Sequence, residues 1–380
     1  MNTKRAPKVR FKGFTDAWEL RKLGELVDVC SGRDYKHLSE GAIPVYGTGG
    51  YMLSVSEALS YDKDAIGIGR KGTIDKPYIL NAPFWTVDTL FYAIPKEKVD
   101  LNFAFDIFQN IKWKKKDEST GVPSLSRTAI NEIHILVPQY DEQQVLGQLF
   151  YGIDRLIALH QRKLDKMKEL KKAFLNLIFS QKLRFYGFTE SWELRKLGEV
   201  APLRGGYAFQ SNQYANEGIP IVRISNILSD GSVGGEFVFH NELKDDEIFM
   251  LENGDIVLAM SGATTGKVSI LSSEKSCKYY QNQRVGLFSK TATCNYSFVA
   301  TIVRSEKFLE QLQDVLVAGA QPNVSAKDID AFDFSVPKNV EEQSQIGNFF
   351  RTLDRLITLY QKKIDSSKEM KKILLKNMLI

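Results

Sequence analysis

Residues 142–175 read EQQVLGQLFYGIDRLIALHQRKLDKMKELKKAFL, and residues 342–375 read EQSQIGNFFRTLDRLITLYQKKIDSSKEMKKILL. Between residues 141–178 and 341–378, 17 of 38 positions are identical. Self-similarity of this length at a constant offset indicates an internal duplication. These segments decide the fold, because each has the apolar periodicity of one long helix and the chain contains it twice.

A second repeated motif begins each copy. Residues 10–25 read RFKGFTDAWELRKLGE, residues 184–199 read RFYGFTESWELRKLGE, and 13 of 16 positions match. The offset is 174 for this motif and 200 for the helical segments, so the second copy has 200 − 174 = 26 more residues between the two markers. The chain therefore consists of two copies of one unit with divergent middles.

Apolar residues in the helical segments alternate at spacings of four and three, which is the spacing of a coiled-coil seam. The first segment contributes Ile153, Ile157, His160, Leu164, Met167, Lys171, Phe174 and Ile178, and the second contributes Leu353, Ile357, Tyr360, Ile364, Ser367, Lys371, Leu374 and Met378. Six of the eight positions are apolar or aromatic in each copy. We therefore expect the two helices to pair with each other. Two amphipathic helices that each pack on their own sheet remain the alternative.

The middle of each copy is rich in short β-branched and aromatic runs bounded by Gly, Pro and Asn, which predicts strands. The runs are 43–46, 88–94 and 133–137 in the first copy and 219–224, 255–260 and 284–288 in the second. Asn253-Gly254 is a hairpin turn signal. The expected fold is α+β: two strand-rich domains at 1–138 and 182–337, each followed by a helix, at 139–181 and 338–380.

The length of the helices suggests a geometry. At about 1.5 Å per residue, 38 residues form a rod of roughly 57 Å. If the two rods pair antiparallel, the strand-rich domains lie at opposite ends and are related by a pseudo-two-fold axis. That separation is roughly one and a half turns of B-DNA, at about 34–36 Å per turn. The geometry suits the reading of two half-sites on one duplex.

Composition excludes several classes of protein. Hydrophobic residues make up 43% of the chain, enough for sizeable cores, and 51 Lys and Arg against 46 Asp and Glu give a net charge of +5. This mild basic excess is compatible with nucleic acid. Three scattered cysteines and four scattered histidines predict neither a disulfide framework nor a metal site. No apolar stretch approaches the length of a membrane span, so we expect a cytoplasmic protein and no membrane partner.

Two glycine-rich segments imitate phosphate-binding loops. Residues 67–72 satisfy G-x-G-x-x-G, but β-branched residues and Pro77 follow where a dinucleotide site needs a helix. Residues 262–268 lack the spacing and the Ser or Thr of a P-loop. Both segments follow a predicted strand, and their cations and hydroxyls could contact DNA phosphates, although a solvated basic hairpin tip explains them about equally well.

Other candidate sites are basic or polar. Residues 112–116 read KWKKK, and residues 162–184 carry eight Lys or Arg against two acids, which a solvated helix face, phosphate contact or an acidic partner could each explain. Residues 281–284 and 223–226 contain side chains that pair with adenine and guanine edges. Isolated carboxylates such as Asp88 and Asp255 are typical of turns and ion pairs. No methyltransferase or nuclease motif is present, so we expect no enzymatic activity from the chain by itself.

Taken together, the ordered and repeated motifs resemble the specificity subunit of type I restriction-modification systems. The resemblance rests on W-E-L-R-K-L-G-E at Trp18 and Trp192, on G-x-x-x-L-S at Gly121 and G-x-x-x-N-V-S at Gly319, and on the V-P…E-Q…D-R-L-I helices from Val137 and Val336. It covers about residues 8–380. No single motif is decisive, whereas the ordered series, present twice, is.

The resemblance implies two target recognition domains, each reading one half of a bipartite, asymmetric site in double-stranded DNA. It implies that the paired helices set the spacer length and dock two modification subunits, and that restriction subunits join the complex. S-adenosylmethionine, ATP and Mg²⁺ are then expected on the partner subunits, with no cofactor or metal on this chain. A duplicated coiled-coil scaffold or adaptor without sequence-specific DNA reading remains the alternative.

The two middles resemble different recognition-domain subtypes, which implies two different half-sites. By this resemblance the expected DNA-binding residues of the first copy are Arg70, Lys71, Thr73, Trp85 and Thr86. Those of the second copy are Arg223, Asn226, Ser261, Thr264, Thr265, Lys267 and Arg284. The expected helix-seam residues are Ile153, Ile157, Leu164, Leu353, Ile357 and Ile364.

Overall fold

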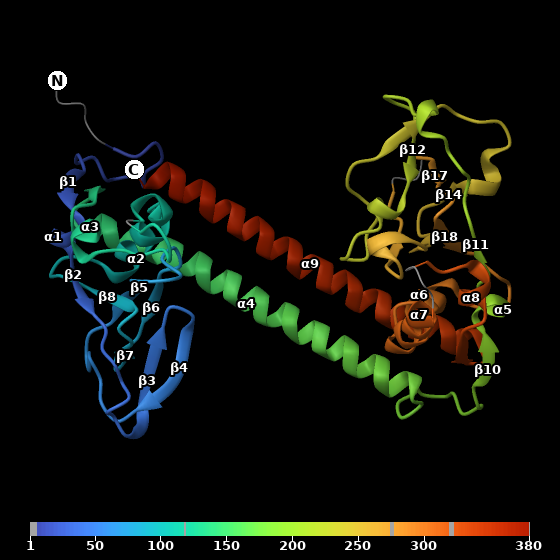
Figure 1. Ribbon diagram of the computed structural model, residues 1–380, viewed down its shortest axis with the longest axis horizontal. Coiled ribbons are helices and arrows are strands. Elements are labelled where there is room, and N and C mark those ends of the chain that lie inside the picture. Colours follow the sequence, from blue (N-terminus) through green and yellow to red (C-terminus); the bar gives the residue numbers. More distant parts are fainter. Residues whose placement is uncertain (1–5, 118, 274–276, 319–322, 380) are drawn as a thin grey trace. The chain divides into compact units, whose positions relative to one another are not determined.

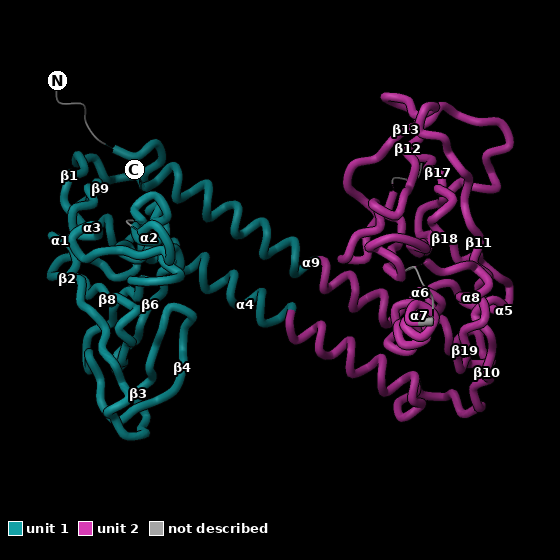
Figure 2. Tube along the Cα trace, viewed as in Figure 1, with its two compact units in different colours: residues 1–164, 359–380 teal, residues 165–358 magenta. Residues whose placement is uncertain are grey.

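The structure is a computed structural model that describes residues 6–117, 119–273, 277–318 and 323–379. The chain divides into two compact units, shown in different colours in Figure 2. Unit 1 comprises residues 1–164 and 359–380, and unit 2 comprises residues 165–358. Each unit therefore contains one strand-rich middle, part of the first long helix and part of the second.

Unit 1 contains nine strands and three shorter α-helices in its described part (Figure 1). The strands are β1 (Glu19–Lys22), β2 (Val27–Ser31), β3 (Glu40–Gly47), β4 (Gly50–Val55), β5 (Ala65–Gly69), β6 (Tyr78–Leu80), β7 (Trp85–Thr86), β8 (Leu90–Pro95) and β9 (His134–Val137). The shorter helices are α1 (Leu23–Leu26), α2 (Leu101–Asn110) and α3 (Arg127–Asn131). The long helix α4 (Tyr140–Phe179) follows β9.

Unit 2 repeats this order, with additions in its middle. Its strands are β10 (Glu193–Lys196), β11 (Leu203–Arg204), β12 (Ile219–Val222), β13 (Val238–His240), β14 (Met250–Leu251), β15 (Ile256–Ala259), β16 (Val268–Ile270), β17 (Tyr279–Gln281), β18 (Val285–Phe288) and β19 (Asp333–Val336). Its shorter helices are α5 (Leu197–Val200), α6 (Tyr296–Ile302), α7 (Glu306–Ala318) and α8 (Ala326–Asp330), and the long helix α9 (Val340–Met378) follows β19.

The strand order is the same in both units, although the middle sequences diverge. One sheet has the order β2-β8-β5-β6 in unit 1 and β11-β18-β15-β16 in unit 2. The other has the order β4-β3-β7 in unit 1 and β13-β12-β17-β14 in unit 2, where β14 is an added edge strand. In both, the first and second strands are antiparallel and the second and third are parallel. The duplication therefore extends through the strand-rich middles.

The repeated W-E-L-R-K-L-G-E motif has a clear structural reason. Its E-L-R-K part forms β1, which pairs antiparallel with β9, and β10 pairs with β19 in the same way. Its second leucine is fully buried and lies in α1 as Leu23 and in α5 as Leu197. The motif thus joins the beginning of each unit to the strand that immediately precedes its long helix.

The two long helices pack against each other antiparallel, which is visible within each unit separately (Figure 1). In unit 1, Asp154 binds Lys371, and His160 further along α4 contacts Tyr360 earlier in α9. In unit 2, Lys171 binds Asp354 and the ring of Phe174 contacts that of Phe349. In both pairs the numbers rise along one helix while they fall along the other, as antiparallel packing requires.

The expected seam residues are covered. Leu164, Leu353 and Ile364 are buried, and Ile153, Ile157 and Ile357 are half-buried. The ends of the helices also enter the domain cores: Leu146, Phe150 and Met378 belong to the main core of unit 1, and Ile178, Ile346 and Phe350 belong to that of unit 2. The mutual pairing and the packing on the strand-rich domain therefore both occur, each over part of the helix.

Glycine permits the close approach of the shorter helices to the long ones. A Cβ on Gly147 would lie 2.3 Å from an Asp100 carboxylate oxygen, and one on Gly347 would lie 2.6 Å from the Phe298 nitrogen. Asp100 and Asn295 are the matching N-caps of α2 and α6. The glycine in E-Q-x-x-x-G thus reflects packing at the same place in both units. The domain ranges expected above, 1–138 and 182–337, stay a prediction.

Candidate DNA interface

In both units the glycine-rich turns lie at one edge of the strands, which we call the strand-end edge. It comprises residues 31–33, 70–73 and 86–89 in unit 1 and residues 205–207, 223–226, 260–265 and 281–284 in unit 2. The Arg70 N–H donates to the Thr89 carbonyl at 2.8 Å, and the Met260 N–H donates to the Arg284 carbonyl at 3.0 Å. The turn after β5 or β15 therefore lies beside the loop that precedes β8 or β18.

A second motif covers this edge. The Leu125 N–H donates to the Arg70 carbonyl at 2.9 Å, and in unit 2 the Val324 N–H donates to the Met260 carbonyl at 3.0 Å. The G-x-x-x-L-S segment thus lies against the turn that sequence reasoning treated separately. Of the G-x-x-x-N-V-S segment, residues 319–322 lie outside the described residues.

Two glycines that sequence reasoning missed shape the edge in both units. A Cβ on Gly32 would lie 2.0 Å from the Val87 carbonyl oxygen, and one on Gly206 would lie 2.2 Å from the Gln281 carbonyl oxygen. Such contacts are impossible without movement of the backbone. The sequence did offer a signal for both: each glycine comes shortly after the strand that follows a W-E-L-R-K-L-G-E motif. Glycine in such a place can indicate that another backbone segment approaches closely.

In unit 1 the structure brings Arg70, Lys71 and Thr73 together at the strand-end edge. Arg70 and Lys71 are exposed, and Thr73 is half-buried. The Arg70 guanidinium donates to the Asp88 carbonyl at 3.3 Å and lies over the Phe91 ring at 5.7 Å from its centroid. These contacts hold one face of the guanidinium, and its exposure leaves other N–H groups available to a ligand.

The structure places Trp85 and Thr86 in the core, where neither side chain is exposed, and their assignment to DNA binding stays a prediction. Trp85 is 4% exposed, its indole N–H donates to the Arg33 carbonyl at 2.9 Å, and Thr86 is 0% exposed. Both lie in β7, the strand that pairs with β3, and Trp85 belongs to a buried hydrophobic cluster with Val45, Val55, Val87 and Leu90. The aromatic and β-branched run signalled a buried strand instead of a contact surface.

In unit 2 the polar candidates converge because two short turns touch. The Thr264 hydroxyl donates to the Ile224 carbonyl at 3.2 Å, which ties the turn Gly262–Thr264 to the turn Ile224–Asn226. Arg223, Ser261, Thr264, Thr265 and Lys267 are half-buried there. Arg284 is exposed in the neighbouring loop. Lys267 donates to the Ser229 hydroxyl at 2.9 Å, beside the turn.

The Asn226 side chain is also buried, with its donors used inside the protein, and its assignment to DNA binding stays a prediction. It is 1% exposed, donates to the carbonyls of Gly234 and Glu236 at 3.0 and 2.9 Å, and accepts from the Arg223 N–H at 3.0 Å. No donor remains to pair with an adenine edge. Asn226 instead fixes the backbone from which Arg223 projects.

Of the carboxylates named in the sequence analysis, Asp255 has contacts that give it a structural role. Asp255 is buried, accepts from the Glu252 N–H at 2.8 Å and lies 3.1 Å from the Lys290 ammonium. Among residues 6–117, 119–273, 277–318 and 323–379, no group of three or more His, Cys, Asp and Glu could hold a metal ion. The arrangement at the strand-end edge supplies cations, hydroxyls and backbone donors, which are the groups that contact phosphates and base edges.

Each unit clamps its first segment to its long helix by the same three residues. In unit 1, Arg10 donates to both oxygens of Glu142, and the Trp18 indole N–H donates to the same carboxylate at 3.3 Å. In unit 2, Arg184 and Trp192 bind Glu342 likewise. Hydrogen bonding to the glutamate raises the pKa of both arginines. The clamp orients each strand-rich domain on its helix.

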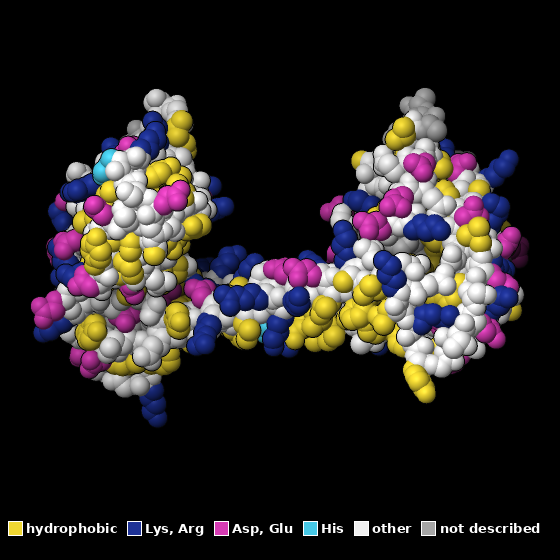
Figure 3. Space-filling view, turned by 90° about the horizontal axis from the view of Figure 1, so that it is seen from below, with side chains coloured by type: hydrophobic (Ala, Val, Ile, Leu, Met, Phe, Trp, Pro, Cys, Tyr) yellow, Lys and Arg dark blue, Asp and Glu magenta, His cyan; other side chains and the backbone are white. Residues whose placement is uncertain are grey.

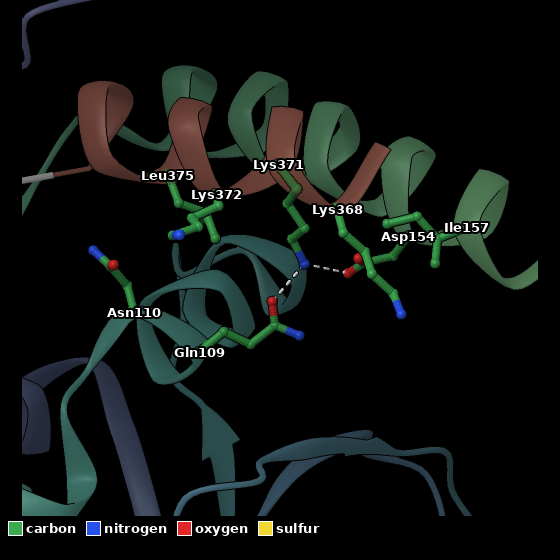
Figure 4. A pocket seen from close by; sticks show the side chains of 8 residues that line it. All are labelled: Gln109, Asn110, Asp154, Ile157, Lys368, Lys371, Lys372 and Leu375. Carbon is green, nitrogen blue, oxygen red and sulfur yellow. Dashed lines mark hydrogen bonds and ion pairs between the residues drawn. The ribbon is translucent and has the colours of Figure 1, made fainter. Parts of the chain in front are cut away.

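A polar cluster interrupts the seam in unit 1, beside a pocket of about 420 Å³ (Figure 4). Lys371 points from α9 toward Gln109 on α2 and Asp154 on α4, and its ammonium lies 2.6 Å from the Asp154 carboxylate. Asp106 is also buried, 4.0 Å from Lys371. Burial raises the pKa of Asp106 to about 8, although the Lys371 ammonium opposes this. The pocket is lined by Gln109, Asn110, Asp154, Ile157, Lys368, Lys371, Lys372 and Leu375.

Unit 2 has the counterpart of this cluster. Lys171 lies 2.5 Å from one Asp354 oxygen, and Arg304 lies 2.9 Å from the other. Arg304 takes the place that Gln109 has in unit 1. A charged layer at the same height of both seams fixes the register of the helices, because a slip would bury these charges without partners.

Charge on the viewed surface is mixed. Figure 3 shows Lys and Arg side chains interspersed with Asp and Glu on both units, in agreement with the small net charge. The cations at the strand-end edge are therefore a local feature and do not belong to a generally basic surface.

In the described part of the chain, no helix is long and apolar enough to cross a membrane.

Comparison with known proteins identifies the duplicated unit. The family model described as "Type I restriction modification DNA specificity domain" matches residues 15–169 and 189–367. The structure also resembles the crystal structure of the S subunit of a type I restriction-modification system from M. genitalium. Their alignment covers 99% of this chain and 99% of that chain, with a TM-score of 0.76. Its sequence identity is 15%, so this likeness shows the fold.

Two relatives carry corresponding names. The type I restriction enzyme MjaVIII specificity subunit of Methanocaldococcus jannaschii is 25% identical over 277 residues, which cover 68% of this chain and 64% of that protein. The type I restriction enzyme EcoAI specificity subunit of Escherichia coli is 25% identical over 230 residues, 58% of this chain and 38% of that protein. The chain thus aligns with less than two thirds of either relative. With both of its halves matched by the family model, the chain belongs to the family of the type I restriction modification DNA specificity domain and contains that domain twice.

Proposed function

We propose that this chain is the DNA sequence-specificity subunit of a type I restriction-modification complex. Each strand-rich domain reads one half of a bipartite, asymmetric site in double-stranded DNA. The paired helices set the length of the unread spacer and dock two modification subunits, and restriction subunits join that assembly in the cytoplasm. Membership of the family, its two copies and the names of the relatives support this proposal.

One observation carries the DNA-reading role: the same strand-end edge occurs twice with different side chains. The hydrogen bond from Arg70 to Thr89 corresponds to that from Met260 to Arg284. A shared backbone with different side chains suits two readers that dock alike and select different bases. The two half-sites are therefore expected to differ.

The chain contributes binding, and its partners contribute the chemistry. At the strand-end edge, cations and hydroxyls can hold phosphates and base edges, which places a neighbouring adenine within reach of a modification subunit. Methyl transfer from S-adenosylmethionine, ATP hydrolysis and Mg²⁺ binding belong to the partner subunits in this proposal. The chain itself is proposed to be non-catalytic.

The test is to co-express the chain with its cognate modification subunit in a host that lacks adenine methylation, and to map methylated adenines across the genome. The expected result is one motif with two short specific halves and a fixed gap. A soluble, assembled complex that leaves the genome unmethylated would contradict the proposal and favour the scaffold alternative.

A further inference from the structure

Two exposed arginines at the strand-end edge of unit 1 belong to none of the motifs discussed so far. Arg33 directly follows Gly32 at the end of β2. Its N–H donates to the Thr86 carbonyl at 2.9 Å, and its carbonyl accepts the Trp85 indole N–H at 2.9 Å. The backbone of Arg33 is thus fixed on the edge, while its side chain is exposed.

Arg127 reaches the same edge from the other side. It is the first residue of α3, directly after the N-cap Ser126, and its guanidinium lies 3.4 Å from the Ser31 hydroxyl. Ser31 is paired with Phe91 across β2 and β8, and the Arg70 guanidinium lies over the Phe91 ring. The guanidinium groups of Arg127 and Arg70 therefore each contact one member of the Ser31–Phe91 pair of neighbouring strands.

The positive charges of Arg33 and Arg127 also act on one residue, Tyr92 in β8. Burial raises the pKa of the Tyr92 hydroxyl, and nearby Cys30 raises it further, whereas Arg33 and Arg127 both act to lower it. With Arg70, three arginines therefore lie at the strand-end edge of unit 1.

These three arginines lack carboxylate partners. Among the described residues, no Asp or Glu oxygen lies within 4.0 Å of the guanidinium groups of Arg33, Arg70 or Arg127. By contrast, Arg21 of the same unit lies 3.2 Å from Glu25. A guanidinium without a carboxylate partner keeps free N–H donors, and phosphate oxygens match its fork of donors.

We propose that Arg33 and Arg127 bind phosphate groups of the DNA backbone at the half-site that unit 1 reads. The inference rests on the proposed function and assigns these residues to positioning the duplex, so that neighbouring residues can read its bases. Phosphate contacts fix register without carrying sequence information. Neutralising either arginine therefore weakens binding at every sequence alike.

The second copy provides substitutions that the fold already accommodates. Ser126 and Ser325 are matching N-caps, so Ala326 occupies the position of Arg127. Gly32 and Gly206 match, and the Tyr207 N–H donates to the Gln281 carbonyl as the Arg33 N–H donates to Thr86. Tyr207 therefore occupies the position of Arg33. The informative variants are Arg127→Ala and Arg33→Tyr.

The experiment measures binding of the purified full-length chain to a fluorescent 30-base-pair duplex of arbitrary sequence at increasing salt, by anisotropy (duplex length roughly two to three turns). The logarithm of affinity falls with the logarithm of salt concentration by about 0.9 per neutralised phosphate. Each variant is expected to reduce this slope by about 0.9 and the affinity by about five- to tenfold. Arg127→Lys and Arg33→Lys keep the charge and are expected to keep the slope.

The matched control is Arg21→Ala, which removes the same charge from a paired arginine of the same unit and is expected to leave the slope unchanged. If Arg21→Ala lowered the slope and the affinity as much as Arg33→Tyr and Arg127→Ala do, the change would reflect surface charge in general, and the inference would be overturned. So would an unchanged slope in both arginine variants, or a methylated motif that relaxes at one base, which indicates base reading. If the parent chain itself shows no salt-dependent binding, the proposed function fails and the inference falls with it.

Discussion

The guanidinium of Arg10 donates two hydrogen bonds of 2.6 Å to the carboxylate of Glu142. Arg184 and Glu342 form the same pair in unit 2, with distances of 2.9 and 2.8 Å. Both glutamates are nearly fully buried at the first turn of a long helix. The pair therefore ties residues before the first strand of each unit to the helix more than a hundred residues later.

We predict that Glu142→Gln destabilises unit 1 and Glu342→Gln destabilises unit 2, each by about 3 kcal/mol, because removal of one partner leaves a buried charge unpaired. Unit 2 contains Trp192 as its only tryptophan, against Trp18, Trp85 and Trp113 in unit 1. Tryptophan fluorescence during urea unfolding of Trp→Phe variants can thus follow the units separately. Arg21→Ala breaks an exposed ion pair and should lower the free energy of unfolding by less than about 1 kcal/mol. A loss as large as that of Glu142→Gln would contradict the role of the clamp.

Gly32→Ala and Gly206→Ala should each impair DNA binding by the unit that carries them, because the new methyl group would collide with a backbone carbonyl and displace the strand-end edge. Gly49→Ala is the control in unit 1, since nothing lies within 4 Å of a Cβ there. The measurement is affinity for the mapped bipartite site, with one half scrambled at a time. If scrambling the first half weakens DNA binding by the Gly32→Ala variant as much as it weakens binding by the parent chain, the first half is not read at this edge.

Asp106 predicts a pH dependence of stability in unit 1. Its pKa is raised to about 8 in the folded state by burial, whereas an unfolded Asp titrates near about 4. The folded state therefore binds the proton more tightly, so stability falls as pH rises from about 4 to about 8. Asp106→Asn should leave the free energy of unfolding nearly unchanged at pH 4.5 and raise it at pH 8.5, measured by urea unfolding at both values. The same increment at both pH values would show that Asp106 stays ionised.

The seam predicts how the gap in the DNA site can be changed. Duplicating residues 156–162 and 356–362 together adds one heptad to each helix, or about 10.5 Å, and preserves the register of the seam. The gap of the methylated motif should lengthen by about three base pairs, with weaker binding because the DNA must also twist. Duplication in one helix alone leaves a heptad unpaired and should lower stability. A motif with its original gap after the double duplication would argue against the helices as the ruler.

The exposed arginines of the two edges, Arg70 in unit 1 and Arg284 in unit 2, predict separable effects on the two half-sites. Met260 occupies the position of Arg70 in unit 2, so Arg70→Met inserts a residue that the edge already accommodates, and it should alter recognition or affinity at the first half only. Thr89 likewise occupies the position of Arg284 in unit 1, and Arg284→Thr should alter recognition or affinity at the second half only. Each loss is expected to be about 1–3 kcal/mol if the arginine reads a guanine edge. Methylation mapping of both variants is the measurement, and a change in the wrong half would refute the equivalence of the edges.

Sequence reasoning predicted the fold well because its signals were periodic and long. Seam residues such as Ile153 and Ile364 follow from a spacing sustained over many turns. The turns at Arg70 and Thr264 were found because glycine-rich segments interrupt strands. Asn253-Gly254 is a turn, but it joins β14 and β15, which lie in different sheets. A turn signal is local and does not specify which strands will pair.

The candidate site was harder to predict, because burial depends on contacts between distant segments. Trp85 and Asn226 are residue types that often contact DNA, yet Trp85 is buried in a hydrophobic cluster and the donors of Asn226 are used by carbonyls of its own loop. Conversely, Arg33 and Arg127 lie 94 positions apart, and Arg127 reaches the strand-end edge because α3 follows the segment that covers Arg70. Nothing in their immediate sequence marks them as residues of the same edge.

The division of the chain into units affects how it is made. Unit 2 is continuous from residue 165 to 358, whereas unit 1 needs residues 359–380 as well as 1–164. A ribosome therefore synthesises all of unit 2 before it reaches the last segment of unit 1, which contains Lys371 and Met378. Until those residues are made, the core of unit 1 lacks the side chains that the end of α9 contributes to it. A premature stop after residue 358 would thus remove core residues from unit 1, which is encoded first, and leave unit 2 intact.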